Sequence, residues 1–344
     1  MEEITIKDVA RMCGVGVSTV SRAINNHPDI NKETKEMIMS VIKEYGYIPN
    51  NSARNLKRTD AKSIAVLVKG MDNPFFNKMI TVLEEEIKKK RYSLVLHHVE
   101  FNEDEVDVAL ELIKEKRLRG IIFLGGHFSH SEEKLKKLQV PFILSTVGCP
   151  PGNMSRDLYS SISVDDEKES GRMVQYLIDQ GHRDIAILAA EMEDTSIGQL
   201  RLEGYKKTLQ RNGIPVRDEL IFNMRRDISY YSMENGYRTT QELLKQGTHC
   251  TAIFAISDLL AIGACRALWD AGKRVPEDFS VAGFDGIELG QYYMPSLTTI
   301  RQPADVMAKE TVALLFEIIA GRENHQHLVY DAELLEREST AKKE

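Results

Sequence analysis

The chain has 344 residues, of which 42% are hydrophobic, and a formal net charge of −7. This length and composition are typical of a globular protein with more than one domain, and no apolar run is long enough to span a membrane. The first residues lack the pattern of a secretion signal, so we expect a cytoplasmic protein. Four scattered cysteines without a Cys-x-x-Cys pair argue against a zinc site.

Two short helices joined by a tight turn are predicted near the start of the chain. Thr5 can cap the first helix together with Asp8, and Gly14 suits the turn that ends it. The second helix has Val20 and Ile24 on its inner face, and its outer face carries small, hydroxyl and basic residues, namely Val17, Ser18, Ser21 and Arg22. Short side chains let a helix approach bases closely, and arginine can donate two hydrogen bonds to guanine. The pattern favours a DNA-binding helix-turn-helix over a helical hairpin of no special function.

A third helix and a short polar segment follow. Residues 31–45 carry an apolar stripe that can close a three-helix core. Residues 49–61 are too short and polar to form a stable helix alone, and Leu56 beside Arg54 suits insertion into a DNA minor groove. The alternative is a flexible linker that happens to contain a leucine. Residues 1–62 hold 10 Lys and Arg against 8 Asp and Glu, while the remainder holds 35 against 44, so positive charge is concentrated at the end predicted to meet phosphate.

From Ser63 onward, apolar strands alternate with helices in two successive series. The first series has strands at 64–68, 94–96, 120–124 and 142–144 and helices at 75–90, 103–116 and 132–138. The second has helices at 167–180, 199–212, 231–246 and 259–271 and strands at 185–188, 252–255 and 280–283. This alternation predicts an α/β fold with two parallel-sheet, Rossmann-like lobes after the all-α headpiece, and a ligand cleft at the carboxyl ends of the strands.

Several motifs together resemble the lactose-repressor (LacI/GalR) family of bacterial transcription regulators over nearly the whole chain. In the headpiece they are Thr-Ile-Lys-Asp-Val-Ala at 5–10, Thr-Val-Ser-Arg at 19–22, Gly-Tyr-Ile-Pro-Asn at 46–50 and Ala-Arg-Asn-Leu at 53–56. In the body they include Asp-Asn-Pro-Phe-Phe at 72–76, Arg-Leu-Glu-Gly-Tyr at 201–205, Gly-Phe-Asp at 283–285 and Leu-Thr-Thr-Ile-Arg-Gln-Pro at 297–303. The resemblance implies a headpiece at 1–48, a hinge at 49–61 that becomes helical on operator DNA, and a body at 62–344 similar to periplasmic sugar-binding proteins.

The resemblance also implies how the body is divided and how the protein assembles. The first lobe would comprise about 62–163 and 296–326, and the second about 164–295 and 327–341, with crossings near Ser163, Pro295 and His327. A homodimer on a palindromic double-stranded operator is expected, because one small headpiece covers little DNA. The last residues carry no leucine heptad, which argues against a tetramer built by a coiled coil.

Two sets of binding residues follow from these motifs. The predicted DNA contacts are Thr5, Val17, Ser18, Ser21, Arg22, Asn25, Asn50, Ala53, Arg54, Leu56 and Lys57. The predicted effector contacts are Phe75, Phe76, His127, Asp165, Arg201, Tyr231, Ser257 and Asp285. One of the two phenylalanines is expected to stack on a ring and the other to join the core, and Asp285 is expected either to accept sugar hydroxyls or to stabilise the crossing.

We therefore expect a repressor whose operator affinity is controlled by a sugar or a sugar-like effector bound between the lobes. Thr146 and Ser257 stand where many sugar-responsive members of the family carry Asp and Asn, which leaves a nucleobase-type corepressor or a protein partner as alternatives. A solute-binding protein without a regulatory role is a third possibility. No nucleotide-binding loop, nucleophile elbow or metal-binding motif is present in the sequence, so we predict no enzyme activity, no cofactor and no metal site.

Overall fold

The chain forms two compact units, Met1–Ala61 and Lys62–Glu344. The structure, a computed structural model, describes residues 4–24, 27, 29–45, 47, 62–70, 72–100, 103–126, 132–148, 155–190 and 197–343. The predicted hinge at 49–61 lies outside the described residues. Within the parts of the chain that are described, no helix combines the length and the apolar composition that crossing a membrane requires.

Three helices make up the described part of the first unit: α1 (Ile6–Met12), α2 (Val17–Ile24) and α3 (Lys32–Glu44). Thr5 caps α1, because its hydroxyl and its backbone N–H both donate to the Asp8 carboxylate, at 2.6 and 3.0 Å. Gly14 has a φ of +63°, the left-handed conformation that lets the chain turn from α1 into α2. The core contains buried residues from all three helices, namely Val9, Ala10, Val20, Ala23 and Ile38.

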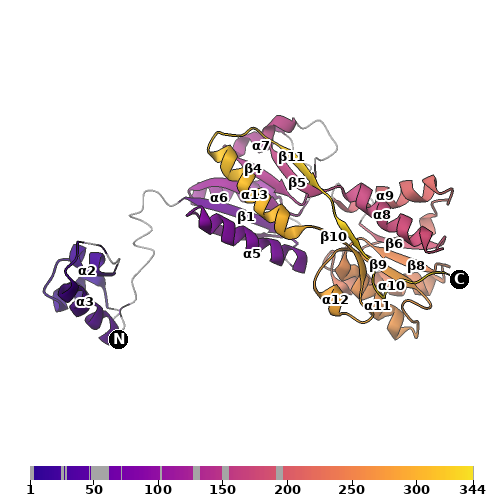
Figure 1. The fold of residues 1–344 in the computed structure, drawn as a ribbon, viewed down its shortest axis with the longest axis horizontal. Helices are drawn as coiled ribbons and strands as arrows, with labels where there is room; N and C mark the ends of the chain where they lie inside the picture. Colours follow the sequence, from indigo (N-terminus) through magenta and orange to yellow (C-terminus); the bar gives the residue numbers. More distant parts are fainter. Residues whose placement is uncertain are drawn as a thin grey trace. The chain divides into compact units, whose positions relative to one another are not determined.

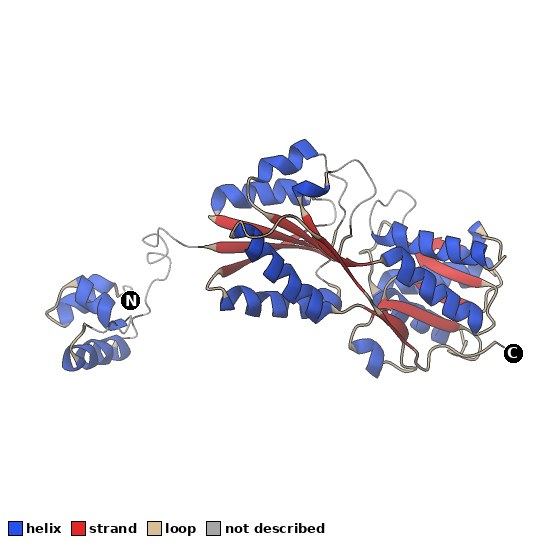
Figure 2. Cartoon of the chain, turned by 45° about the horizontal axis from the view of Figure 1, so that its top comes forward, coloured by secondary structure: helices blue, strands red, loops and turns tan. Residues whose placement is uncertain are grey.

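The second unit consists of two lobes, each built on a six-stranded sheet with helices on both faces (Figures 1 and 2). The first sheet has the strand order β11 (His327–Tyr330), β5 (Ser160–Val164), β4 (Phe142–Ser145), β3 (Leu118–Leu124), β1 (Ser63–Lys69), β2 (Ser93–Val99). The second has the order β12 (Glu333–Leu335), β10 (Thr298–Arg301), β9 (Ser280–Asp285), β8 (Ala252–Ala255), β6 (Ile185–Ala189), β7 (Ile221–Asn223). Every strand pair is parallel except β10 with β12.

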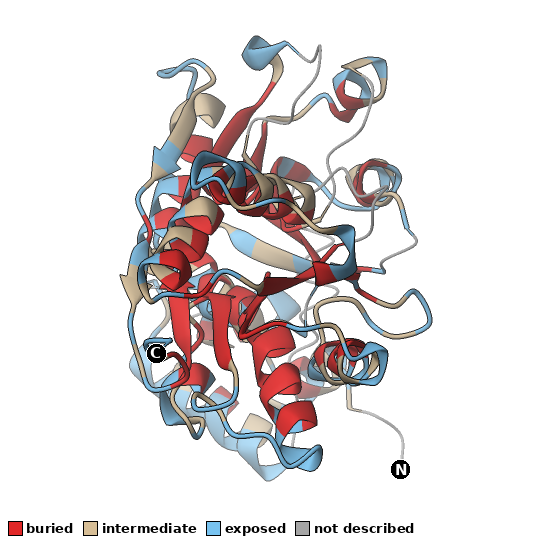
Figure 3. Ribbon diagram, turned by 90° about the vertical axis from the view of Figure 1, so that its right-hand side faces the viewer, coloured by how far each residue is buried: buried red, intermediate tan, exposed pale blue. Residues whose placement is uncertain are grey.

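The inner strands of the first sheet are buried on both faces, which explains why β1 reads as an unbroken apolar run, while the edge strands β2 and β11 are more exposed. Buried strands inside both lobes are red in Figure 3. Side chains alternate along the strand: Ile64, Val66 and Val68 join one cluster, while Ala65 and Leu67 join another. The first cluster is covered by α5 (Pro74–Lys89) and α13 (Ala304–Ile319). The second is covered by α6 (Glu105–Glu115) and by the short helices α7 (Glu132–Leu135) and η1 (Lys136–Leu138).

Helices cover the second sheet in pairs. The helices α8 (Asp166–Asp179) and α9 (Ile197–Arg211) pack against each other, as do α10 (Met233–Gln246) and α11 (Asp258–Asp270). Three shorter helices lie at connections: η2 (Arg156–Leu158), η3 (Asp218–Leu220) and α12 (Leu289–Tyr292). The described structure has nine elements that the sequence pattern does not predict, namely β5, η2, β7, η3, α12, β10, α13, β11 and β12.

The crossings between the lobes follow β5, β10 and β11. Two predicted crossings are therefore wrong. Residues 298–301 form β10 in the second sheet, so the chain crosses after Arg301 and not near Pro295, and residues 327–330 form β11 in the first sheet, so it crosses again after Tyr330 and not near His327. The physical reason is that a strand's own sequence does not reveal which sheet it pairs with.

The segment after β12 stays bound to the second lobe. The Ser339 hydroxyl donates to the carbonyl of Val281 at 2.6 Å, and the backbone N–H of Lys343 donates to the carbonyl of Gln180 at 2.8 Å. The buried ring of His182 lies 3.1 Å from the carbonyl oxygen of Ala341 through Nε2. Residues 298–343 thus supply strands and hydrogen bonds to both lobes.

Two glycines let α10 and α11 approach each other closely. A Cβ atom at Gly263 would lie 2.0 Å from the carbonyl oxygen of Met233, and one at Gly236 would lie 2.2 Å from that of Leu260. Both obstacles are backbone atoms, which cannot move aside without separating the two helices. The packing of this side of the second lobe therefore depends on glycine at both positions.

Substitution Gly263→Ala should lower the stability of the body. Adding atoms to a well-packed core typically lowers the free energy of unfolding by about 1–3 kcal/mol. We expect the upper end of that range, because the atom in the way belongs to the backbone and cannot turn aside as a side chain could. Urea unfolding followed by circular dichroism should give a lower midpoint for this variant. The matched control is Gly290→Ala, whose Cβ would meet its nearest neighbour, the Cβ of Leu297, at an ordinary 3.4 Å. Equal midpoints for both variants would contradict the close approach.

Candidate functional site

The outer face of α2 presents the residue types that the sequence suggested for DNA contact. Val17 is 41% exposed, Ser18 and Arg22 are exposed, and Ser21 is partly buried. Val20 and Ala23 anchor the opposite face in the core, with Ile24 packed partly buried beside them. Arg22 is the basic residue of the last turn, and no acidic residue lies in the first turn of α2. The helix therefore offers one small, basic surface that can enter a major groove.

Not all predicted DNA contacts lie in the described structure. Thr5 is exposed and engaged in the cap of α1, beside the ion pair between Asp8 and Arg11. The other six predicted contacts lie outside the described residues, namely Asn25, Asn50, Ala53, Arg54, Leu56 and Lys57.

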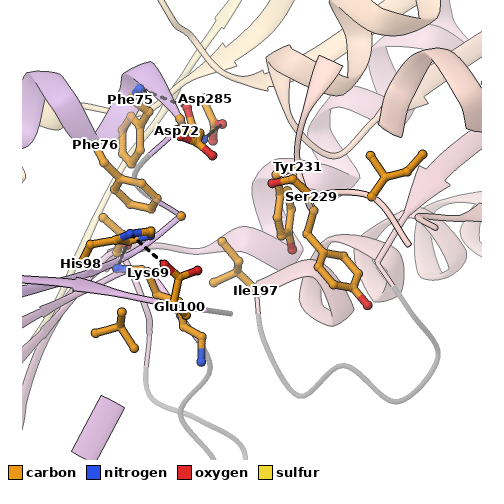
Figure 4. A pocket seen from close by; sticks show the side chains of 18 of the residues that line it. Lys69, Asp72, Phe75, Phe76, His98, Glu100, Ile197, Ser229, Tyr231 and Asp285 are labelled. Atoms are coloured by element: carbon orange, nitrogen blue, oxygen red, sulfur yellow. Dashed lines mark hydrogen bonds and ion pairs between the residues drawn. The ribbon is translucent and has the colours of Figure 1, made fainter. Parts of the chain in front are cut away.

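A cavity of about 440 Å³ lies between the two lobes of the body (Figure 4). The first lobe contributes the ends of β1, β2 and β3 and the start of α5. The second lobe contributes the start of α9, the segment 226–231 and the end of β9. Five of the predicted effector residues line this cavity: Phe75, Phe76, Arg201, Tyr231 and Asp285. The carboxyl ends of strands meet the cavity from both lobes, as expected for an open α/β sheet.

Two predicted effector residues are placed elsewhere. The Asp165 carboxylate caps α8 by accepting a hydrogen bond from the backbone N–H of Lys168 at 3.0 Å. The hydroxyl of Ser257 caps α11 by accepting one from Leu260 at 3.3 Å. Neither residue lines the cavity, so helix capping accounts for both. The predicted contact His127 lies outside the described residues.

Aromatic rings form part of both walls of the cavity. Phe75 and Phe76 both line it, with ring centroids 5.4 Å apart and ring planes 56° apart. Tyr230 and Tyr231 line the wall from the second lobe, and Figure 4 shows Tyr231 there. A Cβ atom at Gly125 would lie 2.7 Å from Cζ of Phe76, so a residue without a side chain is required where the end of β3 meets this ring.

Arg201 is only 2% exposed and is held by groups of its own lobe. Its Nε donates to Oδ1 of Asp166 at 2.9 Å, and its Nη1 donates to the carbonyl of Ile256 at 2.5 Å. Its guanidinium lies over the Phe284 ring, 3.6 Å from the centroid, and 3.6 Å from Oδ1 of Asp285. Burial raises the pKa of Asp166 to about 6, although the neighbouring Arg201 charge opposes that rise. The cluster fixes the starts of α8 and α9 and the end of β9 relative to one another.

The carboxylate of Asp285 is the point at which the two lobes meet inside the cavity. Its Oδ2 accepts a hydrogen bond from Nδ2 of Asn73, in the first lobe, at 2.9 Å. Its Oδ1 accepts one from Nε2 of Gln302, directly after the crossing strand β10, at 3.0 Å. The backbone of Asp285 has a φ of +119°, a strained conformation of the kind that costs about 1–3 kcal/mol and is concentrated at functional sites. Burial raises the pKa of this carboxyl group, and the Arg201 charge opposes the rise.

Asp258 carries a second buried carboxylate, close to that of Asp285. Asp258 accepts hydrogen bonds from the Thr299 hydroxyl at 2.6 Å and from the backbone N–H of Ile287 at 2.8 Å. Burial, followed by the charge of Asp285, raises the pKa of Asp258 to about 8. Asp258 does not line the cavity, so its role is to hold the loop after β9.

The cavity also contains residues that the sequence reasoning missed. Lys69, at the end of β1, donates to Oε2 of Glu105 at 3.2 Å and to the carbonyl of Glu103 at 2.9 Å, and it is 8% exposed. His98 and Glu100 lie at the end of β2, with His98 Nδ1 3.6 Å from Oε1 of Glu100 (Figure 4). In the sequence, Lys69 directly follows the apolar run 64–68. A charged residue at the end of a buried strand is a signal that could have identified it as a cavity residue. Among the described residues, no three His, Cys, Asp or Glu side chains are placed to share a metal ion.

Comparisons with known proteins cover both units. Residues 5–50 match the family described as bacterial regulatory proteins, lacI family, and residues 174–340 match a periplasmic binding protein-like domain. A curated relative, the HTH-type transcriptional regulator MalR of Clostridium butyricum, is 42% identical over 98% of this chain and 99% of its own.

Solved structures agree with this result. One is a lac repressor dimer bound to operator and the anti-inducer ONPF, with 26% identity, a TM-score of 0.73, and coverage of 99% of this chain and 100% of that one. Another is a complex of the transcriptional regulator CelR with cellobiose, with 27% identity, a TM-score of 0.72, and coverage of 98% and 99%. The chain therefore belongs to the LacI family of bacterial transcription regulators, which are cytoplasmic DNA-binding proteins and not enzymes.

Proposed function

We propose that this regulator is a repressor that binds palindromic operator DNA as a homodimer and responds to a carbohydrate held between the lobes of its body. The observation that carries the proposal is the interlobe cavity, in which aromatic rings lie beside a fixed carboxylate and a buried guanidinium. The similar lac repressor structure is a dimer bound to operator, and the similar CelR structure is a complex with cellobiose.

The composition of the cavity suits a neutral polar ring. Aromatic faces such as Phe75 and Tyr231 can pack against the apolar C–H surface of a sugar, while a few fixed polar groups orient its hydroxyls. A carboxylate such as Asp285 has acceptor positions beyond the two hydrogen bonds it already receives. Lys69 and Arg201 are each paired with a carboxylate of their own lobe. The cavity is also lined by Arg226 and by four acidic residues, Asp72, Glu100, Asp227 and Asp285, so it presents no large unbalanced positive charge for an anionic ligand.

Regulation follows if the ligand prefers one arrangement of the lobes. A ligand that touches both lobes binds more tightly when they are closed around it, and it shifts operator affinity only by the difference between its affinities for the two arrangements. Such coupling is typically about 1–3 kcal/mol and must be reciprocal, so the operator changes sugar affinity by the same factor. In the family, the predicted hinge is the segment through which this coupling would reach the headpiece.

A thermal-shift comparison of four ligands should separate a sugar from a nucleobase. Maltose, cellobiose, ribose and hypoxanthine would each be added to the full-length protein. At least one sugar should raise the unfolding temperature, because a ligand present at a hundred times its Kd stabilises the folded state by about 2.7 kcal/mol. Stabilisation by hypoxanthine together with no response to any sugar would refute the carbohydrate assignment.

Substitution Asp285→Asn should weaken binding of the sugar that responds in that comparison. The change keeps the shape of the side chain but removes a charged acceptor, and hydrogen bonds to charged groups contribute about 1.5–3 kcal/mol. We therefore expect calorimetry to give a Kd roughly 10- to 100-fold higher. Arg201→Ala is a poorer test, because it would leave Asp166 and Asp285 buried without their cation.

The matched control for Asp285→Asn is Asp305→Asn. Asp305 has a half-exposed carboxylate, is paired with Lys78 at 2.9 Å and does not line the cavity. The Asp305→Asn variant should bind the sugar with the same affinity as the wild type. Unchanged affinity in Asp285→Asn would remove this carboxylate from the binding site.

Substitution Arg22→Ala should relax the base preference of operator binding. Removing one two-bond contact to a base costs about 1–3 kcal/mol and acts at particular base pairs. The operator can be selected from a random duplex library, and affinities for its single-base variants measured by fluorescence anisotropy. The control Arg11→Ala removes an exposed arginine of α1 that pairs with Asp8. An equal loss on every sequence would mean that Arg22 contacts phosphate only.

A further inference from the structure

A single side chain of the first lobe makes two hydrogen bonds of different kinds. Oδ1 of Asn73 accepts a hydrogen bond from the backbone N–H of Phe75 at 3.0 Å, which caps α5. Its Nδ2 donates to Oδ2 of Asp285 at 2.9 Å, in the second lobe. Phe75 and Asp285 accordingly lie together at one end of the cavity (Figure 4). Capping uses the acceptor half of the amide, and the contact between the lobes uses the donor half.

The partner of Asn73 is held in place by its own surroundings. The Asp285 carboxylate is 5% exposed, accepts a second bond from Gln302 and faces Arg201, which is itself fixed by Asp166. Its backbone has a positive φ that only a well-packed neighbourhood maintains. Movement of the second lobe away from the first would therefore break the bond to Asn73, because Asp285 cannot follow the first lobe.

We infer that Asn73 is a positioning residue that links the start of α5 to the ligand-facing carboxylate of Asp285, and so makes closure of the lobes part of ligand binding. This inference rests on the proposed function, because Asp285 is taken to face the effector. When the lobes close, the amide of Asn73 orients the carboxylate toward the cavity. When they open, the carboxylate loses its hydrogen bond from Asn73, and the start of α5 is released from the second lobe.

The two hydrogen bonds of Asn73 can be separated by substitution. Asp and Ser cap helices about as well as Asn does, so Asn73→Asp and Asn73→Ser should both preserve α5. Neither can make the contact between the lobes. An aspartate offers no donor and places a second negative charge beside Asp285, whereas a serine is too short to reach it. The matched control is Asn77→Asp, which adds the same charge at an exposed position on the same helix.

The first measurement needs no ligand. Amide hydrogen exchange of the full-length protein at pH 8 should be about tenfold faster in Asn73→Asp than in the wild type at residues 284–287, Gln302 and Ala304, the factor expected when one hydrogen bond to a charged group is lost. Asn77→Asp should exchange as the wild type does. If Asn73→Asp fails to fold, Asn73→Ser decides in its place. Wild-type exchange in the folded variant would overturn the inference and leave Asn73 as a helix cap.

The second measurement tests the link to the ligand, with maltose and cellobiose as probes. In Asn73→Asp, calorimetry should show about tenfold weaker binding of whichever sugar binds the wild type, while Asn77→Asp binds normally. Wild-type affinity in Asn73→Asp would overturn the positioning role. If neither sugar binds the wild type, ribose is used in their place; if none of the three binds, the proposed effector fails, but the exchange measurement still decides whether Asn73 joins the lobes.

Discussion

The arrangement of the body depends on one buried guanidinium. Arg201 is surrounded by Asp166, Asp285, the carbonyl of Ile256 and the ring of Phe284, and is almost inaccessible to water. Taking such charges out of water costs several kcal/mol per ion unless the partners are well placed, and removing one partner leaves an uncompensated charge. The ends of three elements, α8, α9 and β9, are therefore fixed at a single point. That point lies in the wall of the cavity, so the same interaction that fixes the second lobe also fixes the Asp285 carboxylate, which lines the cavity.

The first lobe has a different kind of wall, made largely by backbone approach and aromatic packing. Gly125 leaves room for the Phe76 ring, and Glu105 pairs with Lys69 at the end of β1. The two walls meet through Asn73 and Gln302. The wall from the second lobe is thus fixed mainly by ion pairs and hydrogen bonds, and the wall from the first lobe mainly by close packing. A polar ring with apolar faces can use both kinds of surface at once, which supports the proposed carbohydrate ligand.

The sequence contained enough information for the local structure but not for the contacts between distant elements. The helix expected at 75–90 is found at Pro74–Lys89, because its apolar stripe and its capping asparagine are close together in the chain. Phe75, Arg201 and Asp285 could be predicted to face a cavity because each lies near a strand-to-helix turn. Asp165 and Ser257 lie at similar turns, but a hydrogen bond to a nearby backbone N–H explains both, and a sequence does not distinguish a cap from a contact. His98 and Asn73 were missed because their roles depend on how the two lobes pack.

The long return path of the chain has a consequence for how the protein is made. Each sheet is completed by a strand that comes late in the sequence: β11 pairs with β5, and β10 pairs with β9 while β12 closes the edge. The segment up to Lys343 then bonds back to Gln180. Pairing between residues as far apart in sequence as those of β11 and β5, or as Lys343 and Gln180, is slow, since the entropy of closing long loops opposes it before the contacts form. During synthesis the first lobe cannot be completed before β11 has left the ribosome, and the second cannot be completed before β12 and the segment up to Lys343 have done so, so both lobes should complete folding late and close together in time.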